Sequence, residues 1–79
     1  MTKQREIECL RELYATMEKD LVNMTVQAYF YRKEAENSVH IGKQQAEESL
    51  ATYEKRIAYI KENLQAYVMY ASEVLKTEL

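Results

Sequence analysis

Apolar residues recur at steps of three and four along the second half of the chain. They stand at Leu50, Tyr53, Ile57, Ile60, Leu64, Tyr67, Ala71 and Val74. Alternating steps of this kind place one apolar seam along an α-helix, and they are typical of a helix that packs lengthwise against another. The pattern therefore predicts an all-α coiled coil.

The first half of the chain carries a matching seam. Its members are Ile7, Leu10, Tyr14, Met17, Leu21, Met24, Ala28, Tyr31 and Ala35. No residue between Lys3 and Glu36 breaks a helix, because the chain has no proline and its only glycine is Gly42. We predict one domain over 1–79, with a first helix over 3–36 and a second over 43–78.

A cluster of turn residues separates the two seams and predicts a turn over 37–42. Asn37 can end a helix, Ser38 can cap the next one, and Gly42 can adopt a positive φ. The seam also slips by one residue here, so a straight continuous helix would turn its apolar stripe away from its partner. One long kinked helix that pairs in a multimer is the alternative.

An antiparallel hairpin folded at His40 and Ile41 brings the two seams into register. In such a hairpin, facing residues have numbers with a constant sum, which is 81 for every pair predicted here. The predicted pairs are Tyr31 with Leu50, Ala28 with Tyr53, Met24 with Ile57, Leu21 with Ile60, Met17 with Leu64, Tyr14 with Tyr67, Leu10 with Ala71 and Ile7 with Val74. Small residues face large ones in two of these pairs, Ala28 with Tyr53 and Ala71 with Leu10, and such mixed sizes favour close packing.

Residues that flank the seam also match across the hairpin. Arg32 is expected to face Glu47, and Glu18 is expected to face Lys61. Exposed ion pairs stabilise a protein by only about 0.2–1 kcal/mol each, so they support the register more than the stability.

Some apolar residues find no partner in a two-helix hairpin. One group widens the seam at the end far from the loop and consists of Leu13, Val68, Tyr70 and Leu75. A second stripe lies on the outer side of the first helix and consists of Val22, Val26, Tyr29 and Phe30. We predict that these eight residues bind a partner, because another chain would cover them. Two hairpins forming a four-helix bundle, as a homodimer, is the simplest closed assembly. A different protein as the covering chain, or a merely exposed stripe, are the alternatives.

Chemical groups are sparse in the sequence. The only histidine, His40, follows Glu36 by four residues, a metal-ligand spacing on a helix, but the pair falls in the predicted turn and nothing completes a site. The single cysteine, Cys9, allows no internal disulfide and is expected to be a small buried hydrophobe at an interface. With no catalytic signature, we expect no enzyme, no metal and no cofactor.

The charges indicate the setting and the class of partner. Charged residues make up 30% of the chain, the net charge is −2, and basic residues are scattered among acidic ones, so we do not expect a nucleic-acid partner. Apolar runs are too short to cross a bilayer, the N-terminus lacks a signal-peptide pattern, and a lone cysteine suits a reducing compartment. We therefore expect a cytoplasmic protein without membrane contact.

Surplus apolar surface without a chemical site favours a small interaction protein, such as an adaptor, a co-chaperone or an inhibitor of a larger complex. A helical nucleic-acid-binding regulator is an alternative, since Tyr29 and Phe30 stand close to Arg32 and Lys33. A structural component that assembles with itself is the other alternative.

Overall fold

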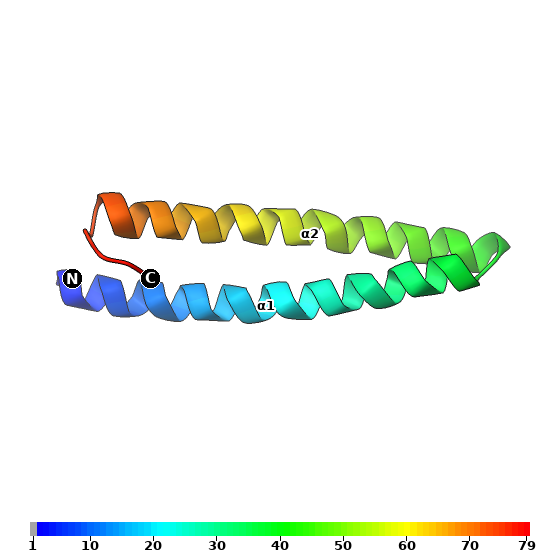
Figure 1. The fold of residues 1–79 in the computed structure, drawn as a ribbon, viewed down its shortest axis with the longest axis horizontal. Coiled ribbons are helices and arrows are strands. Elements are labelled where there is room, and N and C mark those ends of the chain that lie inside the picture. The colour runs from blue at the N-terminus through cyan, green and yellow to red at the C-terminus, as the bar shows by residue number, and fades with distance from the viewer. Residues whose placement is uncertain (1) are drawn as a thin grey trace.

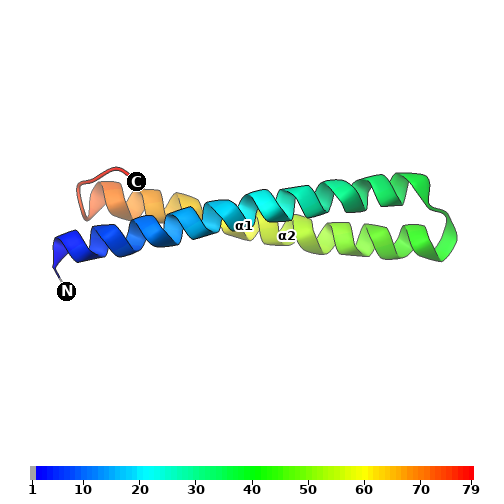
Figure 2. The ribbon, with the colours of Figure 1, turned by 90° about the horizontal axis from the view of Figure 1, so that it is seen from below.

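The computed structural model describes residues 2–79 and shows an elongated helical hairpin (Figure 1). Helix α1 spans Lys3–Asn37 and α2 spans His40–Glu73, and the described residues form no strand. The helices lie antiparallel and pack against each other, with overall dimensions of 56 × 17 × 16 Å. A second view shows them crossing near the middle of the hairpin (Figure 2). The predicted all-α hairpin is confirmed.

Helix α1 begins at a capped N-terminus. The backbone N–H of Arg5 donates to the Thr2 hydroxyl oxygen at 3.3 Å, and the N–H of Glu6 donates to the Thr2 carbonyl at 3.1 Å. The first bond satisfies an N–H group that has no backbone acceptor in the first turn of a helix, and the second is the first regular backbone bond of α1. The helix ends at Asn37, one residue after its predicted end.

The loop between the helices is shorter than the predicted turn over 37–42. Only Ser38 and Val39 lie between the helices, and both have extended backbone. His40 then adopts a left-handed φ of 58° at the start of α2. Because this residue helps reverse the chain, no glycine is needed there, and Gly42 lies inside α2 without a positive φ. The predicted start of the second helix at 43 was therefore wrong by three residues.

The C-terminal end of α2 also differs from the prediction of a helix to 78. The N–H groups of Val74 and Leu75 both donate to the Tyr70 carbonyl, at 2.9 and 3.3 Å, so the last turn widens. Lys76 has a left-handed φ of 56°, and the N–H of Thr77 donates to the Ala71 carbonyl at 3.0 Å. The chain consequently leaves the helix after Glu73 and turns back over the open end of the hairpin (Figure 1).

This turn changes which residue closes the open end. Leu75 is only 3% exposed, whereas Val74 is 57% exposed. The predicted pairing of Ile7 with Val74 is therefore wrong, because the widened turn moves the buried position one residue along the chain. The returning segment is held by Arg11, whose Nη2 donates to the Glu78 carbonyl at 3.3 Å.

The core follows the predicted seam except at Ala46 and Leu75, which are buried although they lie outside it. The buried apolar residues are Ala28, Ala35, Ala46, Ile60, Leu64, Ala71 and Leu75. Four of these seven are alanines, which let the helices approach closely but bury little apolar area each. The other residues of the seam on α1 are half-buried. The hairpin thus has a narrow core with no large side chain fully buried among the described residues.

The flanking ion pairs differ from the two that were predicted. Arg32 Nη2 lies 3.5 Å from Glu54 Oε1, and not beside Glu47. Glu54 occupies the same edge of α2 one heptad further along, so both glutamates were available to this arginine. Across residues 2–79 the other ion pair joins Lys33 and Glu36 within α1, and the predicted pair of Glu18 with Lys61 is not formed.

Candidate interaction surface

His40 and Cys9, the two residues considered for metal or thiol chemistry, lie at opposite ends of the described hairpin. No three histidine, cysteine, aspartate or glutamate side chains among the described residues are placed to hold a metal ion. His40 is exposed at the loop, and Cys9, predicted to be buried at an interface, is exposed near the opposite end of the hairpin. The main surface feature of the described hairpin is its set of exposed apolar side chains.

The outer stripe, consisting of Val22, Val26, Tyr29 and Phe30, lies on the side of α1 that faces away from α2. All four side chains are exposed, from 45% for Val26 to 64% for Val22. Their spacing keeps them within about two turns on one face of the helix. The structure therefore brings these four predicted residues together on one surface.

The other four predicted residues do not form one surface. Leu75 is buried by its own chain, so it is not available to a partner. Leu13 and Tyr70 are exposed and lie on the same side of the hairpin, near its open end. Val68 precedes Tyr70 by two residues, and two steps of a helix turn a side chain by about 200°, so Val68 lies on a different side.

The aromatic end of the outer stripe is held together by its own contacts. The rings of Tyr29 and Phe30 meet edge to face, with centroids 5.6 Å apart and planes inclined by 72°. Lys33 Nζ lies 5.7 Å from the Tyr29 ring centroid, within the range of a cation–π contact. These contacts already restrict the side chains of Tyr29 and Phe30. Less conformational entropy is therefore lost when a partner binds, which favours binding.

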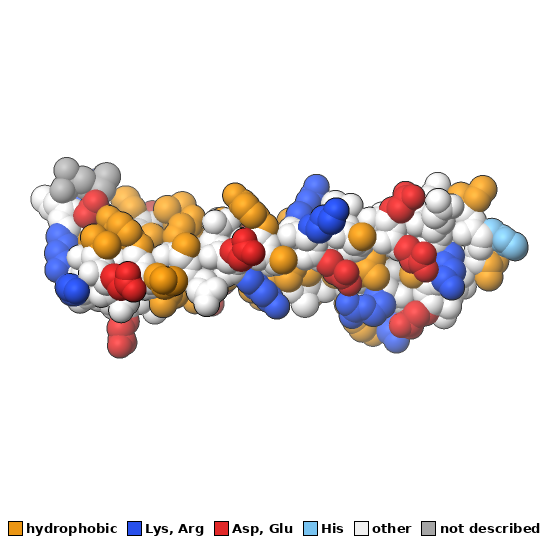
Figure 3. Space-filling view, turned by 90° about the horizontal axis from the view of Figure 1, so that it is seen from above, with side chains coloured by type: hydrophobic (Ala, Val, Ile, Leu, Met, Phe, Trp, Pro, Cys, Tyr) orange, Lys and Arg blue, Asp and Glu red, His pale blue; other side chains and the backbone are white. Residues whose placement is uncertain are grey.

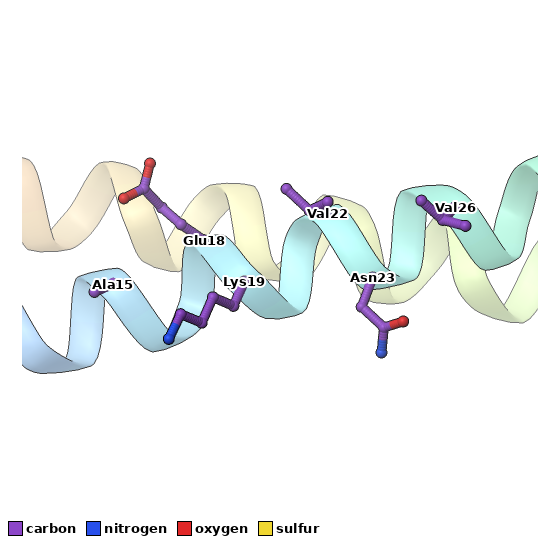
Figure 4. A pocket seen from close by; sticks show the side chains of 6 residues that line it. All are labelled: Ala15, Glu18, Lys19, Val22, Asn23 and Val26. Carbon is purple, nitrogen blue, oxygen red and sulfur yellow. The ribbon is translucent and has the colours of Figure 1, made fainter.

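A shallow groove continues the outer stripe toward the N-terminus of α1 (Figure 4). It is lined by Ala15, Glu18, Lys19, Val22, Asn23 and Val26. Figure 4 shows Val22 and Val26 along one edge of the groove and Lys19 and Asn23 along the other. All of the lining residues belong to α1, so this is a groove on one helix surface and not a cleft between helices. Grooves of this kind receive the side-chain ridge of another helix.

Several residues of this face were missed in the sequence-based interpretation. Along this face the steps alternate between four and three residues, through Ala15, Lys19, Val22, Val26, Tyr29 and Lys33. The outer side of α1 thus carries its own heptad seam, from Ala15 to Lys33. The spacing could have revealed this seam, but an alanine and a lysine give a weak apolar signal.

The outer side of α2 offers no comparable stripe. Figure 3 shows this face, with apolar side chains gathered toward the open end of the hairpin and charges of both signs alternating toward the loop. Tyr59 and Met69 are 65% and 54% exposed here, but they lie far apart along α2, and charges such as Glu62 and Lys55 occupy positions next to Tyr59. The outer face of α1 is therefore the better candidate for binding a helix.

Neither helix of the described chain contains a stretch long and apolar enough to span a bilayer. Comparison of the chain with protein-family models, with curated proteins and with solved structures found no match.

Proposed function

We propose that this chain is a non-enzymatic interaction module that binds a helix of another polypeptide along the outer face of α1. The observation that carries this proposal is the exposed apolar stripe at heptad spacing, which no other part of the described chain covers. An adaptor, a co-chaperone or an inhibitor of a larger complex would act in this way, in a cytoplasm that keeps Cys9 reduced.

Burial of the stripe would supply the binding free energy. Fully burying a valine or phenylalanine side chain stabilises a complex by roughly 1.5–3 kcal/mol. The four side chains of the outer stripe are 45–64% exposed. A helix packed on them would bury this remaining area, so each residue would contribute part of that free energy to binding. Tyr29 and Phe30 are the natural anchors, because aromatic side chains dominate the free energy of many interfaces.

The shape of the surface supports a helix as the bound element. The groove, from Ala15 to Val26, and the stripe, from Val22 to Phe30, follow one face of α1. An amphipathic helix with apolar residues at heptad spacing matches this face along its whole length. A second hairpin, giving four helices in all as predicted from the sequence, is one way to supply such a helix.

Affinity capture from the native cell tests the proposal with two matched variants. Val26→Glu with Phe30→Glu places two charges in the stripe, whereas Tyr59→Glu places one on the outer side of α2. Proteins that bind through the stripe should be retained by the original chain and by Tyr59→Glu, and lost from the double variant. Capture of the same proteins by all three chains would contradict the proposal.

A further inference from the structure

We propose that the helix covering the outer stripe is α1 of a second copy of this chain, packed antiparallel, with Val22 of each copy against Val26 of the other. This inference rests on the proposed function, because it assigns an occupant to the same surface. It is carried by two observations: the narrow core of the single hairpin, and the way the charges along α1 match themselves in one orientation.

The hairpin alone buries little. Its buried residues are mostly alanines, and no large side chain is fully buried among the described residues. Long helices draw most of their stability in water from packing an apolar face, and small domains with little burial commonly gain the rest by oligomerisation. A second copy supplies this burial wherever the chain itself is present, and its association adds to folding stability by mass action.

Charge selects the antiparallel orientation. In a parallel pair of α1 helices, each seam residue faces its own copy, so Lys19 would face Lys19 and Lys33 would face Lys33. In an antiparallel pair centred near Val22 and Val26, Lys19 instead faces Tyr29 of the second copy. An ammonium group beside a tyrosine ring is favourable, as the contact of Lys33 with Tyr29 in this chain illustrates.

The residues beside the outer seam agree with the same register. Glu18 lies level with Arg32 of the second copy, and two-fold symmetry makes this pair twice. Glu18 forms no ion pair within residues 2–79, so its carboxylate is free to accept this contact. Arg32 contacts Glu54 at 3.5 Å with a half-exposed side chain, and a guanidinium has donors for a second carboxylate.

A compact square bundle of two hairpins is less well supported than this back-to-back pair. A square bundle would bury the flanking positions of both helices, which on one side include Asp20 and Gln27 of α1 and Arg56 and Asn63 of α2. These side chains are polar and would need partners in the buried core. Pairing through the outer faces of α1 gives a layer of four helices, with the two α1 helices in the centre.

Two charge reversals test the antiparallel register. In a homodimer of Glu18→Arg, an arginine faces an arginine at both copies of this pair. In a homodimer of Arg32→Glu, a glutamate faces a glutamate at both copies, so like charges weaken each homodimer. A mixed dimer has opposite charges at both pairs. At one pair the two introduced residues face each other with their signs exchanged, and at the other the original Glu18 faces the original Arg32. Native mass spectrometry of the mixture should show several-fold more heterodimer than either homodimer. Circular dichroism of each variant checks that these exposed substitutions leave the hairpin helical.

The control reverses a charge that lies outside the interface. Glu62→Arg, on the outer side of α2, should form dimers as the original chain does and should mix with it statistically. Statistical mixing of Glu18→Arg with Arg32→Glu, or an original chain that shows no dimer, would overturn the inference.

The outcomes separate this inference from the proposed function. If the original chain is monomeric but the Val26→Glu, Phe30→Glu variant loses its captured proteins, self-pairing is wrong and the interaction function stands. If the heterodimer is favoured but capture is unaffected by the double variant, the stripe serves self-pairing and the proposed function is wrong.

Discussion

The rings of Tyr31 and Tyr53 stack across the two helices, with centroids 5.4 Å apart and planes inclined by 27°. Both side chains are half-buried, and the guanidinium carbon of Arg56 lies 5.5 Å from the Tyr53 ring centroid. Because few large side chains are buried in this hairpin, the stack is a main cross-helix contact in the half nearer the loop.

A double-mutant cycle measures this stack. Tyr31→Ala and Tyr53→Ala should each destabilise the hairpin, and the double variant should lose less than the sum of the two. We expect a coupling free energy of about 0.5–1.5 kcal/mol, the range found for aromatic pairs. Chemical unfolding at a fixed protein concentration measures it, and Tyr29→Ala paired with Tyr53→Ala is the additive control. Simple additivity of the Tyr31 and Tyr53 effects would show that the rings do not interact.

Leu75 and Val74 should respond differently to truncation. Leu75→Ala removes a side chain that is 3% exposed, so we expect a loss of about 2–4 kcal/mol of unfolding free energy. Val74→Ala truncates a residue that is 57% exposed, and its effect should stay within about 0.5 kcal/mol. Thermal unfolding of both variants compares them. A larger loss for Val74→Ala would mean that α2 continues as a regular helix past Glu73.

Gly42→Ala should stabilise the protein. Gly42 lies inside α2, and an added Cβ would lie 3.7 Å from Ser38 Cβ, which is an ordinary van der Waals contact. Alanine is favoured over glycine in a helix interior by about 0.5–1 kcal/mol. An increase of this size in the unfolding free energy is the expected result. Destabilisation would place Gly42 in the turn, where the sequence pattern predicted it.

His40→Gly should also stabilise the protein, for a different reason. A residue with a Cβ at φ 58° adopts a left-handed conformation that costs roughly 1–2 kcal/mol, and glycine avoids most of this cost. The greater freedom of glycine in the unfolded chain offsets part of the gain, so we expect a net increase of about 0.5–1 kcal/mol. His40→Val, which disfavours this φ, serves as the opposite control and should destabilise the hairpin.

Regular spacing made most of the fold predictable. The steps of three and four identified both helices and their seam, because a helix buries residues at that period whatever their exact type. The outer stripe was found in the same way from Val22 to Phe30. Ala15 and Lys19 were missed because a search for apolar spacing gives little weight to a small side chain or a charged one. Both still contribute to a helix face, alanine by leaving room for a partner and lysine through its aliphatic chain.

The errors lie where backbone geometry is decided locally. Neither His40 nor Lys76 is a residue type that signals a left-handed φ as glycine does, so the short loop and the early end of α2 had no clear signature. Arg32 had two glutamates on the same edge of α2, and heptad spacing alone does not choose between Glu47 and Glu54.

The most direct test of the account is the molar mass of the chain in solution, measured by light scattering behind a sizing column across a tenfold range of concentration. A covered outer stripe predicts a mass of about 19 kDa, twice the 9.4 kDa of one chain, that falls to the single-chain value in the Val26→Glu, Phe30→Glu variant. A mass of 9.4 kDa for the original chain at every concentration would contradict self-pairing and leave the stripe exposed in the isolated protein.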